Sequence, residues 1–399
     1  MSLAATLIER LLGVPSMIDA ELEVARNLFP IAKIGKNAAV TQYDDVVDVL
    51  ARDKDFATDY NAKLTVIMSG QPFFLGLPDG AEFQRDVAAM RQTMPPGDVA
   101  SRLVPATLAA AQKRVDAGKG SLNVVDYIND ITFEVLCGYF GTPAPAGVDM
   151  KVWAQTLFTF LFADMKNDPA LGAQAQATAT SLQKHIDSLI AARKAKPGAD
   201  DVLGRALKLQ AQGVPGTSDL QIRSSLIGFI VAGLPQPGIA APQALNQLFN
   251  RPKPLAAAQK AAKAGDDAGV RAHFFEALRF DPLAPFLIRR AAGNQILGKG
   301  RKHETTITDG TRVFAVIQSA MMDGRHVKNP GKFDINRPAS DYLSFGVGLH
   351  TCFAKAINEA TIPLMLKPLL ASGKLSRAAG DAGKLVKTGI FPASLVVTY

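Results

Sequence analysis

Apolar residues recur at three- and four-residue intervals along most of the chain, which is the spacing of one face of an α-helix. Ser, Asp, Gly and Pro bound these stretches, as capping and helix-breaking residues do. The stretches that predict helices are 16–29, 41–53, 81–94, 121–141, 149–165, 177–195, 218–233 and 268–282. Strand-like patterns are fewer and lie at 31–42, 294–320 and 393–399. The pattern therefore predicts a mainly α protein with small β-sheets.

One predicted helix runs into two prolines. The segment 218–233 becomes wholly apolar and indicates a buried helix, yet Pro235 and Pro237 follow it with Gln236 between them. A proline inside a helix removes a hydrogen bond, clashes with the preceding turn and costs about 3 kcal/mol. We therefore expect a long helix that is distorted at residues 233–238.

Composition and charge restrict the class of protein. The 399 residues contain no repeat and no linker long enough to separate domains, so we expect one large domain over residues 1–399. The net charge of +8 is spread along the chain, and no motif favours a nucleic-acid partner. Two cysteines exclude a disulfide framework and favour the cytoplasm. Glu9 and Arg10 interrupt the apolar stretch at 1–17, which predicts neither a membrane span nor a signal peptide.

The strongest candidate for chemistry is Cys352, in "LSFGVGLHTCFAKAI". Gly346 and Gly348 allow tight turns before it, and a helix is expected after it. A thiolate at a helix N-terminus is stabilised by the helix dipole, which lowers its pKa below about 8.5. Most free cysteines are buried and inert instead, and Cys137 in "FEVLCGYF" fits that interpretation.

Three uses of such a thiolate can be compared. A nucleophilic cysteine needs a histidine and an orienting Asn or Asp, and His350 two residues away fits no protease spacing. Zinc needs three or four ligands, and the five histidines are scattered. Haem iron needs only one strong proximal ligand, so a single thiolate suits it.

The Cys352 loop resembles the cysteine loop of the cytochrome P450 family. Further pieces follow the family in order along nearly the whole chain. "EALR" is similar to its Glu-x-x-Arg helix, with Glu276 and Arg279 on one helical face. "NPGKFDINRP" at 329–338 is similar to the meander that precedes the cysteine loop. The segments 41–53 and 77–87 resemble the second-helix region and the start of the C helix.

The resemblance implies the cytochrome P450 fold as a single haem domain, with haem b (iron protoporphyrin IX) as cofactor. It implies that Cys352 binds the iron and that Glu276 and Arg279 form a structural pair. Haem propionates are carboxylates that need charge-assisted donors when they are buried. The residues implied to bind the cofactor are Arg85, Arg289, His350, Phe345, Gly346 and Gly348.

Some positions depart from the family pattern. Ala354 stands where a glycine is usual after the cysteine, and Tyr342 where a propionate-binding histidine is common. Lys332 stands where an arginine often completes the Glu-x-x-Arg network, and a lysine lacks the planar fork of arginine. None of these changes removes haem binding.

The departure at "VAGLPQP" bears on activity. This stretch matches the family's Ala-Gly-x-acid-Thr segment, which crosses the haem on its distal side and delivers protons to bound dioxygen. Pro235 replaces the acid and Gln236 replaces the alcohol. Gln236 can donate a hydrogen bond but cannot titrate, so only water remains to supply protons. The resemblance makes Gln236 and Gly233 the candidate catalytic residues.

Three functions follow from this resemblance. One is an enzyme that uses peroxide or rearranges an organic hydroperoxide, which needs no proton relay and no electron donor. A second is a conventional monooxygenase with a ferredoxin-type electron donor. There, Glu359 replaces an arginine that often helps an acidic donor to dock, although Lys355 remains nearby. A third is a non-catalytic haem-binding protein.

The expected partner is a hydrophobic small molecule. In this family the regions 56–80 and 157–165 line or cover the substrate pocket, and both are rich in apolar residues here. Their apolar side chains include Leu64, Val66, Ile67, Met68, Phe73, Phe74, Phe158, Phe160 and Phe162. Many such side chains belong to the core of a protein, so the sequence does not name the substrate.

Overall fold

The computed structural model describes residues 7–9 and 19–399. The predicted helix cap at Ser16 and most of the stretch 1–17 lie outside the described residues. The chain divides into two compact units. The first unit contains residues 1–59, 243–254 and 272–355, and the second contains residues 60–242, 255–271 and 356–399. The chain passes between them repeatedly, and the expectation of a single domain stays a prediction.

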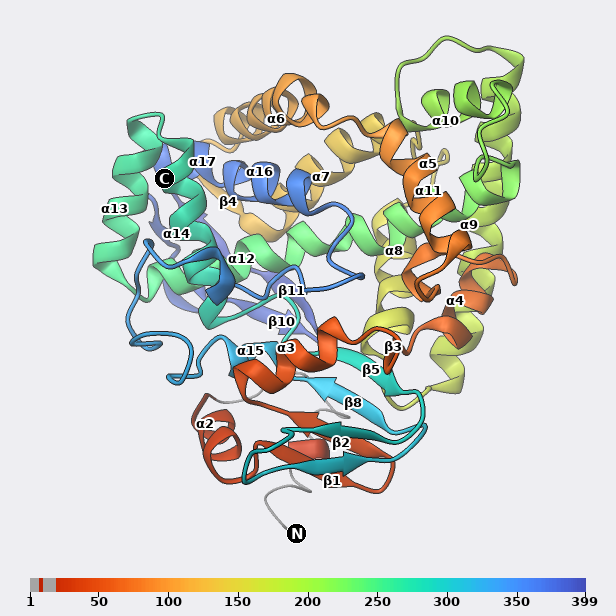
Figure 1. Ribbon diagram of the computed structural model, residues 1–399. Coiled ribbons are helices and arrows are strands. Elements are labelled where there is room, and N and C mark those ends of the chain that lie inside the picture. The colour runs from red at the N-terminus through yellow and green to blue at the C-terminus, as the bar shows by residue number, and fades with distance from the viewer. Residues whose placement is uncertain (1–6, 10–18) are drawn as a thin grey trace. The chain divides into compact units, whose positions relative to one another are not determined.

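The first unit is built on a five-stranded sheet (Figure 1). Its strands, in spatial order, are β1 (Ile31–Ile34), β2 (Asn37–Val40), β8 (Arg312–Ala315), β5 (Leu287–Ala291) and β3 (Phe56–Thr58). Only the β2–β8 pair is parallel. The predicted strand pair at 31–42 is confirmed as β1 and β2, with Gly35 in its turn at φ 56°. The sheet matters for the site because β5 carries Arg289, opposite Thr58 on β3.

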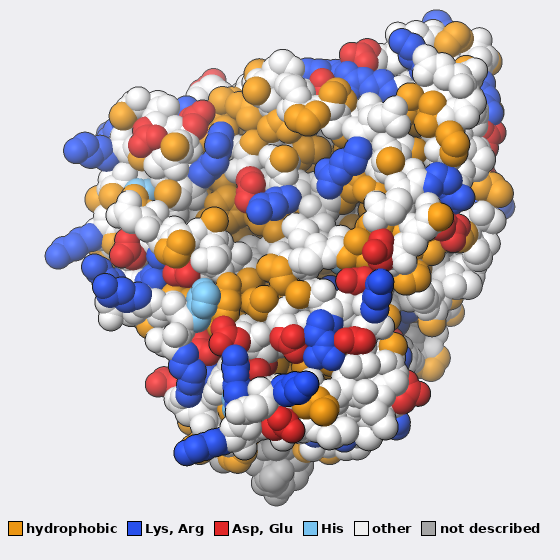
Figure 2. Space-filling view, viewed as in Figure 1, with side chains coloured by type: hydrophobic (Ala, Val, Ile, Leu, Met, Phe, Trp, Pro, Cys, Tyr) orange, Lys and Arg blue, Asp and Glu red, His pale blue; other side chains and the backbone are white. Residues whose placement is uncertain are grey.

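Helices and a hairpin complete the first unit. They are α2 (Asp19–Leu28), α3 (Tyr43–Ala51), α15 (Ile317–Ala320), β6 (Gln295–Leu297) and β7 (Thr305–Ile307). Apolar side chains from α3, the sheet and the hairpin form one buried cluster, which includes Val46, Phe56 and Val313. On the face shown in Figure 2, basic and acidic side chains are interspersed over this part of the molecule. This agrees with pairs such as Arg52 with Asp48 and with Asp55.

The second unit is mainly helical. Its helices are α4 (Asn61–Met68), α5 (Ala81–Thr93), α6 (Val104–Ala117), α7 (Val124–Phe140), α8 (Met150–Phe158), α9 (Pro169–Ala195), α10 (Val202–Ala211), α11 (Asp219–Gly233) and α17 (Lys367–Ala371). The helices α12 (Pro235–Phe249), α13 (Pro252–Lys263), α14 (Asp267–Phe280) and α16 (Lys355–Met365) contribute residues to both units. Its strands are β4 (Ser121–Asn123), β9 (Ser376–Arg377), β10 (Val386–Thr388), β11 (Phe391–Ser394) and β12 (Val396–Thr398).

The predicted helices are confirmed, and their ends shift for local reasons. The helix predicted at 121–141 begins at Val124, where Asn123 caps it, because 121–123 pair with β12 as a strand. The helix predicted at 177–195 begins at Pro169 and is capped by Asp168. Asp168 is a strong cap, and proline is favoured at the first helical position.

The helix distortion predicted at 233–238 is narrower in the structure. Helices α11 and α12 are separated only by a bend at Leu234, whose φ of −71° and ψ of −37° are still helical and whose amide donates to the Ile230 carbonyl at 3.3 Å. Pro235 and Pro237 lie in the first turn of α12 and have no backbone N–H to donate. The prolines therefore interrupt the hydrogen bonds of one long helical stretch, Asp219–Phe249, without ending it.

Among the described residues, Asp219–Phe249 is the one helical stretch long and apolar enough to cross a membrane by length and composition. Its mean hydropathy reaches 1.3, but 83% of that apolar window is buried inside the protein. A capping box formed by Ser218 and Gln221 fixes its start. The burial is that of a core helix, which agrees with the apolar pattern of 218–233.

A buried ion cluster in the second unit links three helices. Asp98 is 7% exposed, forms an ion pair with Arg205 on α10 and accepts a hydrogen bond of 2.9 Å from the Tyr139 hydroxyl on α7. Burial alone would raise the pKa of Asp98, but the hydrogen bonds from Arg205 and Tyr139 and the charges of Arg205 and Arg102 outweigh it and lower that pKa. The ionised carboxylate is therefore the form that the fold stabilises.

We expect Asp98→Asn to lower the free energy of unfolding at pH 7 by about 1–3 kcal/mol, since it leaves Arg205 without that charge partner. A carboxylate with a lowered folded-state pKa stabilises the fold above its unfolded pKa and loses this effect as the pH falls. The difference between variant and wild type should therefore shrink below about pH 4. Urea denaturation at both pH values measures it.

Asp200→Asn is the matched control for this prediction. Asp200 also pairs with Arg205, but its side chain is 70% exposed. Exposed ion pairs contribute only about 0–1 kcal/mol. Equal losses in the two variants would contradict the role assigned to the buried carboxylate.

Candidate functional site

The Cys352 loop lies in the first unit and is held by its own backbone. The Cys352 amide donates to the Phe345 carbonyl at 2.9 Å, and the Gly346 amide donates to Leu343 at 2.9 Å. The Lys355 amide donates to the Cys352 carbonyl at 3.1 Å, where α16 begins. Cys352 is partly exposed, whereas Cys137 is 8% exposed. The structure thus places a partly exposed cysteine at the end of a tight loop before a helix.

The two glycines of the loop are required by its backbone. Gly346 has φ 66° and Gly348 has φ 78°, a region that favours glycine. A Cβ on Gly348 would lie 2.8 Å from the Leu50 carbonyl oxygen, and one on Gly346 would lie 3.3 Å from the Leu287 side chain. Both positions therefore need glycine for close approach as well as for conformation.

Phe345 fixes the start of the loop against α14. Its ring centroid lies 5.7 Å from that of Phe275, and the Lys355 ammonium lies 5.9 Å from the Phe345 centroid. Aromatic pairs at this distance contribute about 0.5–1.5 kcal/mol beyond the area they bury. Phe345 therefore connects α14, the loop and the first residue of α16.

Arg289 and His350 lie close enough to interact. Arg289, on β5, is 4% exposed and donates to the Ile288 carbonyl at 2.9 Å. The pKa of His350 is lowered to about 4, mainly by burial and then by the positive charge of Arg289, with Asp53 opposing. The structure thus brings a buried cation and a neutral imidazole together in the unit that holds Cys352, a donor pair suited to carboxylates.

Arg85 has a different environment. It lies on α5 in the second unit, and its side chain is 36% exposed. Its guanidinium donates to Asp86 at 2.8 Å and to Glu82 at 3.4 Å, and its pKa is raised mainly by the hydrogen bond to Asp86. The role of Arg85 toward a cofactor stays a prediction.

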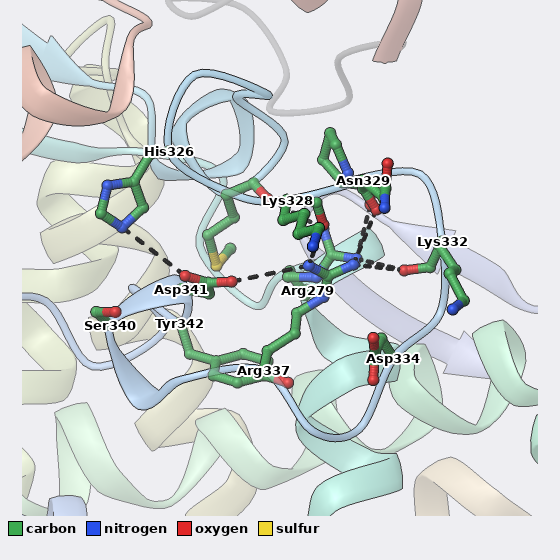
Figure 3. A network of polar contacts seen from close by, with 12 residues as sticks. Arg279, His326, Lys328, Asn329, Lys332, Asp334, Arg337, Ser340, Asp341 and Tyr342 are labelled. Carbon is green, nitrogen blue, oxygen red and sulfur yellow. Dashed lines mark hydrogen bonds and ion pairs between the residues drawn. The ribbon is translucent and has the colours of Figure 1, made fainter.

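A network of polar contacts surrounds Arg279 (Figure 3). Glu276 and Arg279, on α14, both have fully buried side chains and form two hydrogen bonds, of 2.8 and 3.0 Å. The predicted pair therefore exists, and it is buried rather than solvated. Arg279 also donates to the backbone carbonyls of Met321 and Pro330, at 3.0 and 2.7 Å.

The prediction that Lys332 occupies the place of the third member of this network is wrong. Arg337 is that member: its side chain is 4% exposed and donates to Glu276 at 3.2 Å. Lys332 contributes its backbone carbonyl, which accepts from Arg337 at 2.7 Å and from Arg279 at 3.3 Å. The sequence contains the signal, since Arg337 closes the segment 329–338, but spacing alone could not show which side chain turns inward.

The helical face that carries Gly233 and Gln236 is partly exposed. Ala232, Gly233 and Gln236 share one face of the α11–α12 stretch, and all three are partly exposed, while Val231, Leu234 and Pro235 are buried. No atom lies within 4 Å of the position that a Cβ on Gly233 would occupy. The face therefore borders open space. Of these three residues, Gln236 alone has a polar side chain, and its amide does not titrate.

Aromatic side chains line the helix beside this face. Phe73 packs so tightly on Gly228 that a Cβ there would lie 2.2 Å from its ring. Phe74 and Phe140 lie 6.4 and 5.6 Å from Phe229 by ring centroids. Phe73 and Phe74, which were expected to line a pocket, are mostly buried, at 7% exposed each. The sequence analysis did not predict that Phe73 packs on Gly228.

Comparisons with known proteins give the context of these features. A family profile described as Cytochrome P450 matches residues 270–381, which contain Glu276, Arg279, Arg337 and Cys352. Putative cytochrome P450 137 of Mycobacterium tuberculosis is 26% identical over 216 residues, 53% of this chain and 45% of that protein. 6-Deoxyerythronolide B hydroxylase of Saccharopolyspora erythraea is 22% identical over 368 residues, 88% of this chain and 86% of that protein. The chain spans about half the length of the curated relatives it matches first.

Among solved structures, P450BioI in complex with hexadec-9Z-enoic acid ligated acyl carrier protein has a TM-score of 0.80 and 20% identity, covering 98% of this chain and 100% of that chain. That likeness shows the fold. The fold is mainly α with small sheets, as in these P450 structures. The comparisons support the cytochrome P450 family for this chain, and members of that family bind haem, iron protoporphyrin IX.

The residues present fit this cofactor by their chemistry. An accessible thiol at the end of a glycine loop offers one soft ligand for iron, and no group of three or more His, Cys, Asp or Glu among the described residues offers a different metal site. Arg289 and His350 offer donors for carboxylates in the same unit. The assignments of Cys352, Arg289, His350, Phe345, Gly346 and Gly348 to the cofactor remain proposals.

Proposed function

We propose that the protein is a haem-thiolate oxidoreductase that transfers one oxygen atom from a peroxide to an apolar organic substrate. The balanced reaction is R–H + H₂O₂ → R–OH + H₂O, and an organic hydroperoxide can replace hydrogen peroxide. The observation that carries this proposal is the partly exposed face with Gly233 and Gln236, neither of which has a side chain that gains or loses a proton.

The bound haem supplies the redox chemistry, and a thiolate ligand donates electron density that favours O–O cleavage. Cys352 would be that ligand. Arg289 and His350 would hold propionates, since both lie in the unit of the cysteine loop and a buried cation with a neutral imidazole suits carboxylates. Phe345, Gly346 and Gly348 shape the loop that presents the thiolate.

Gln236 would act as a hydrogen-bond donor toward the oxidant. Its amide lies on the exposed helical face, next to the open space beside Gly233. A preorganised donor of this kind stabilises developing negative charge and is worth about 3 kcal/mol. It does not relay protons, and a peroxide needs fewer of them than dioxygen because it arrives reduced and protonated.

The second candidate is a ferredoxin-dependent monooxygenase, with the balance R–H + O₂ + 2e⁻ + 2H⁺ → R–OH + H₂O. The similarity to 6-deoxyerythronolide B hydroxylase over most of both chains favours it. In that case water in the open space beside Gly233 would deliver the protons. Glu359 on α16, where an acidic donor would prefer a cation, counts against tight docking. A non-catalytic haem protein ranks last because the cysteine loop is complete.

An apolar substrate is supported by the aromatic side chains along α11. Phe73, Phe74, Phe140 and Phe229 form a connected cluster there. Pockets for such ligands are mostly apolar with a few placed polar groups, and Gln236 is a polar group of that kind. The similarity to 6-deoxyerythronolide B hydroxylase, and to a P450BioI structure in complex with a hexadec-9Z-enoic acid ligated acyl carrier protein, agrees with an apolar ligand.

The test compares two routes on the same purified protein and an apolar probe such as a medium-chain fatty acid. One route uses hydrogen peroxide, and the other uses NADH with a surrogate ferredoxin and reductase. We expect the peroxide route to be at least as fast, and Gln236→Ala to slow it about 100-fold. Gln236→Thr restores an alcohol and should improve the oxygen route relative to Gln236→Ala.

Two results would change the conclusion. Turnover with ferredoxin and NADH alone would favour the second candidate over the first. Peroxide turnover that Gln236→Ala leaves unchanged would remove the amide from the chemistry while keeping the oxidant.

A further inference from the structure

Tyr342 connects the cysteine loop to the buried network. It lies three residues before Phe345, is partly exposed, and its hydroxyl donates to Glu276 Oε2 at 3.0 Å. The other donors to the Glu276 carboxylate are Arg279, Arg337 and the backbone amide of Asp334. Tyr342 is the one of these donors that belongs to the segment leading directly into the loop (Figure 3).

Hydrogen bonds continue from Tyr342 toward Cys352. The next amide, Leu343, donates to the Met321 sulfur at 3.3 Å, and Arg279 donates to the Met321 carbonyl at 3.0 Å. The Leu343 carbonyl then accepts from Gly346, and the Phe345 carbonyl accepts from Cys352, both at 2.9 Å. A shift of Tyr342 would therefore move a short, hydrogen-bonded segment that ends at Cys352.

The hydroxyl of Tyr342 cannot serve two carboxylates at once. A phenol has one O–H to donate, and a carboxylate is an acceptor only. Burial and the neighbouring Glu276 raise the pKa of Tyr342, so the phenol keeps its proton. A hydroxyl that donates to Glu276 has no proton left for a haem propionate.

We propose that Tyr342 is a positioning residue whose hydroxyl ties the cysteine loop to Glu276, and that it does not bind a haem propionate. The inference rests on Cys352 being the iron ligand, as in the proposed function. Tyr342 stands where a propionate-binding histidine is common in the family, and here its role is to hold the cysteine loop in place instead. Arg289 and His350 in the first unit, and Arg85 in the second, stay the residues proposed for the propionates.

The experiment uses Tyr342→Phe, which removes only the hydroxyl. The reduced protein is mixed with carbon monoxide, and the fraction that keeps the thiolate-ligated absorption band is followed over time in mild urea. We expect the variant to lose this band roughly 10–150 times faster than the wild type, the factor for one hydrogen bond to a charged group. A reconstitution with haem dimethyl ester, which has no free propionate, repeats the measurement.

The matched control is Tyr127→Phe. Tyr127 is 3% exposed, and its hydroxyl donates to the Met365 carbonyl at 2.6 Å, so this variant also loses one buried hydrogen bond. Tyr127→Phe should lower the thermal stability. When each protein is measured at the same interval below its own melting temperature, the thiolate band of this variant should persist as long as that of the wild type. A merely structural loss would act alike in both variants.

The outcomes separate the alternatives. Faster band loss in Tyr342→Phe with both haem forms, and not in Tyr127→Phe, supports the positioning role. An effect that disappears with the dimethyl ester would assign Tyr342 to a propionate and overturn the proposal, as would no effect at all. A wild type that never shows the thiolate band would instead overturn Cys352 as the ligand.

Discussion

Cys352→Ala should abolish the absorption band that thiolate-ligated, reduced haem shows with carbon monoxide. The thiol is partly exposed at the end of the glycine loop, so removing its sulfur should leave little cavity. Unfolding of the haem-free protein should therefore change by less than about 1.5 kcal/mol, while the ligand itself is lost. Spectroscopy of the reduced protein with carbon monoxide measures the first effect, and urea denaturation measures the second.

Cys137→Ala is the control for this prediction. Cys137 is 8% exposed, and burial raises the pKa of its thiol to about 12, against a weaker effect from Thr142. A thiol that stays protonated in the core does not ligate iron, so the band should be unchanged. A band that persisted in Cys352→Ala and disappeared in Cys137→Ala would reverse the assignment.

The sequence predicted most of the fold because its helices are long and strongly periodic. Capping residues such as Ser218 and Asn123 mark where helices begin, and local chemistry of this kind can be recognised without tertiary contacts. The 121–141 helix was predicted three residues too early, since a strand that pairs with a segment near the C-terminus has no local signature.

The candidate site was predictable where it depends on backbone conformation. Gly346 and Gly348 have the positive φ that their positions required, and Cys352 follows them as expected. Side-chain direction was not predictable. Asn329 has φ 48°, and the Lys332 amide donates back to its carbonyl, so the segment turns and its carbonyls, not the Lys332 side chain, face the arginines.

The prolines show how tertiary context changes a local rule. In isolation Pro235 and Pro237 predict a distorted helix, and in the structure the distortion is confined to a bend at Leu234, whose φ and ψ stay helical. The long apolar helix is thus kept, and its partly exposed face still carries Gly233 and Gln236. The chemistry available on that face depends on its side chains, and the segment with the two prolines supplies only the Gln236 amide.

Arg337→Ala should destabilise the protein far more than Lys332→Ala, by about 3–5 kcal/mol against less than about 1 kcal/mol. The Arg337 guanidinium is 4% exposed and donates to Glu276 at 3.2 Å, and also to the Lys328 and Asn329 carbonyls at 2.7 and 2.9 Å. Its removal leaves the buried Glu276 carboxylate with fewer positive partners and strands several acceptors.

Lys332 is the informative comparison because the sequence analysis placed Lys332, and not Arg337, at the position that completes the network. Its side chain is exposed, and Lys332→Ala keeps the backbone carbonyl that accepts from Arg337 and Arg279. Arg337→Lys keeps the charge but loses the fork that reaches one carboxylate and several carbonyls, so it should recover only part of the loss. Urea denaturation of the four proteins at one pH measures the series. Equal losses in Arg337→Ala and Lys332→Ala would mean that the meander is held by its turn alone, and that the buried carboxylate does not depend on Arg337.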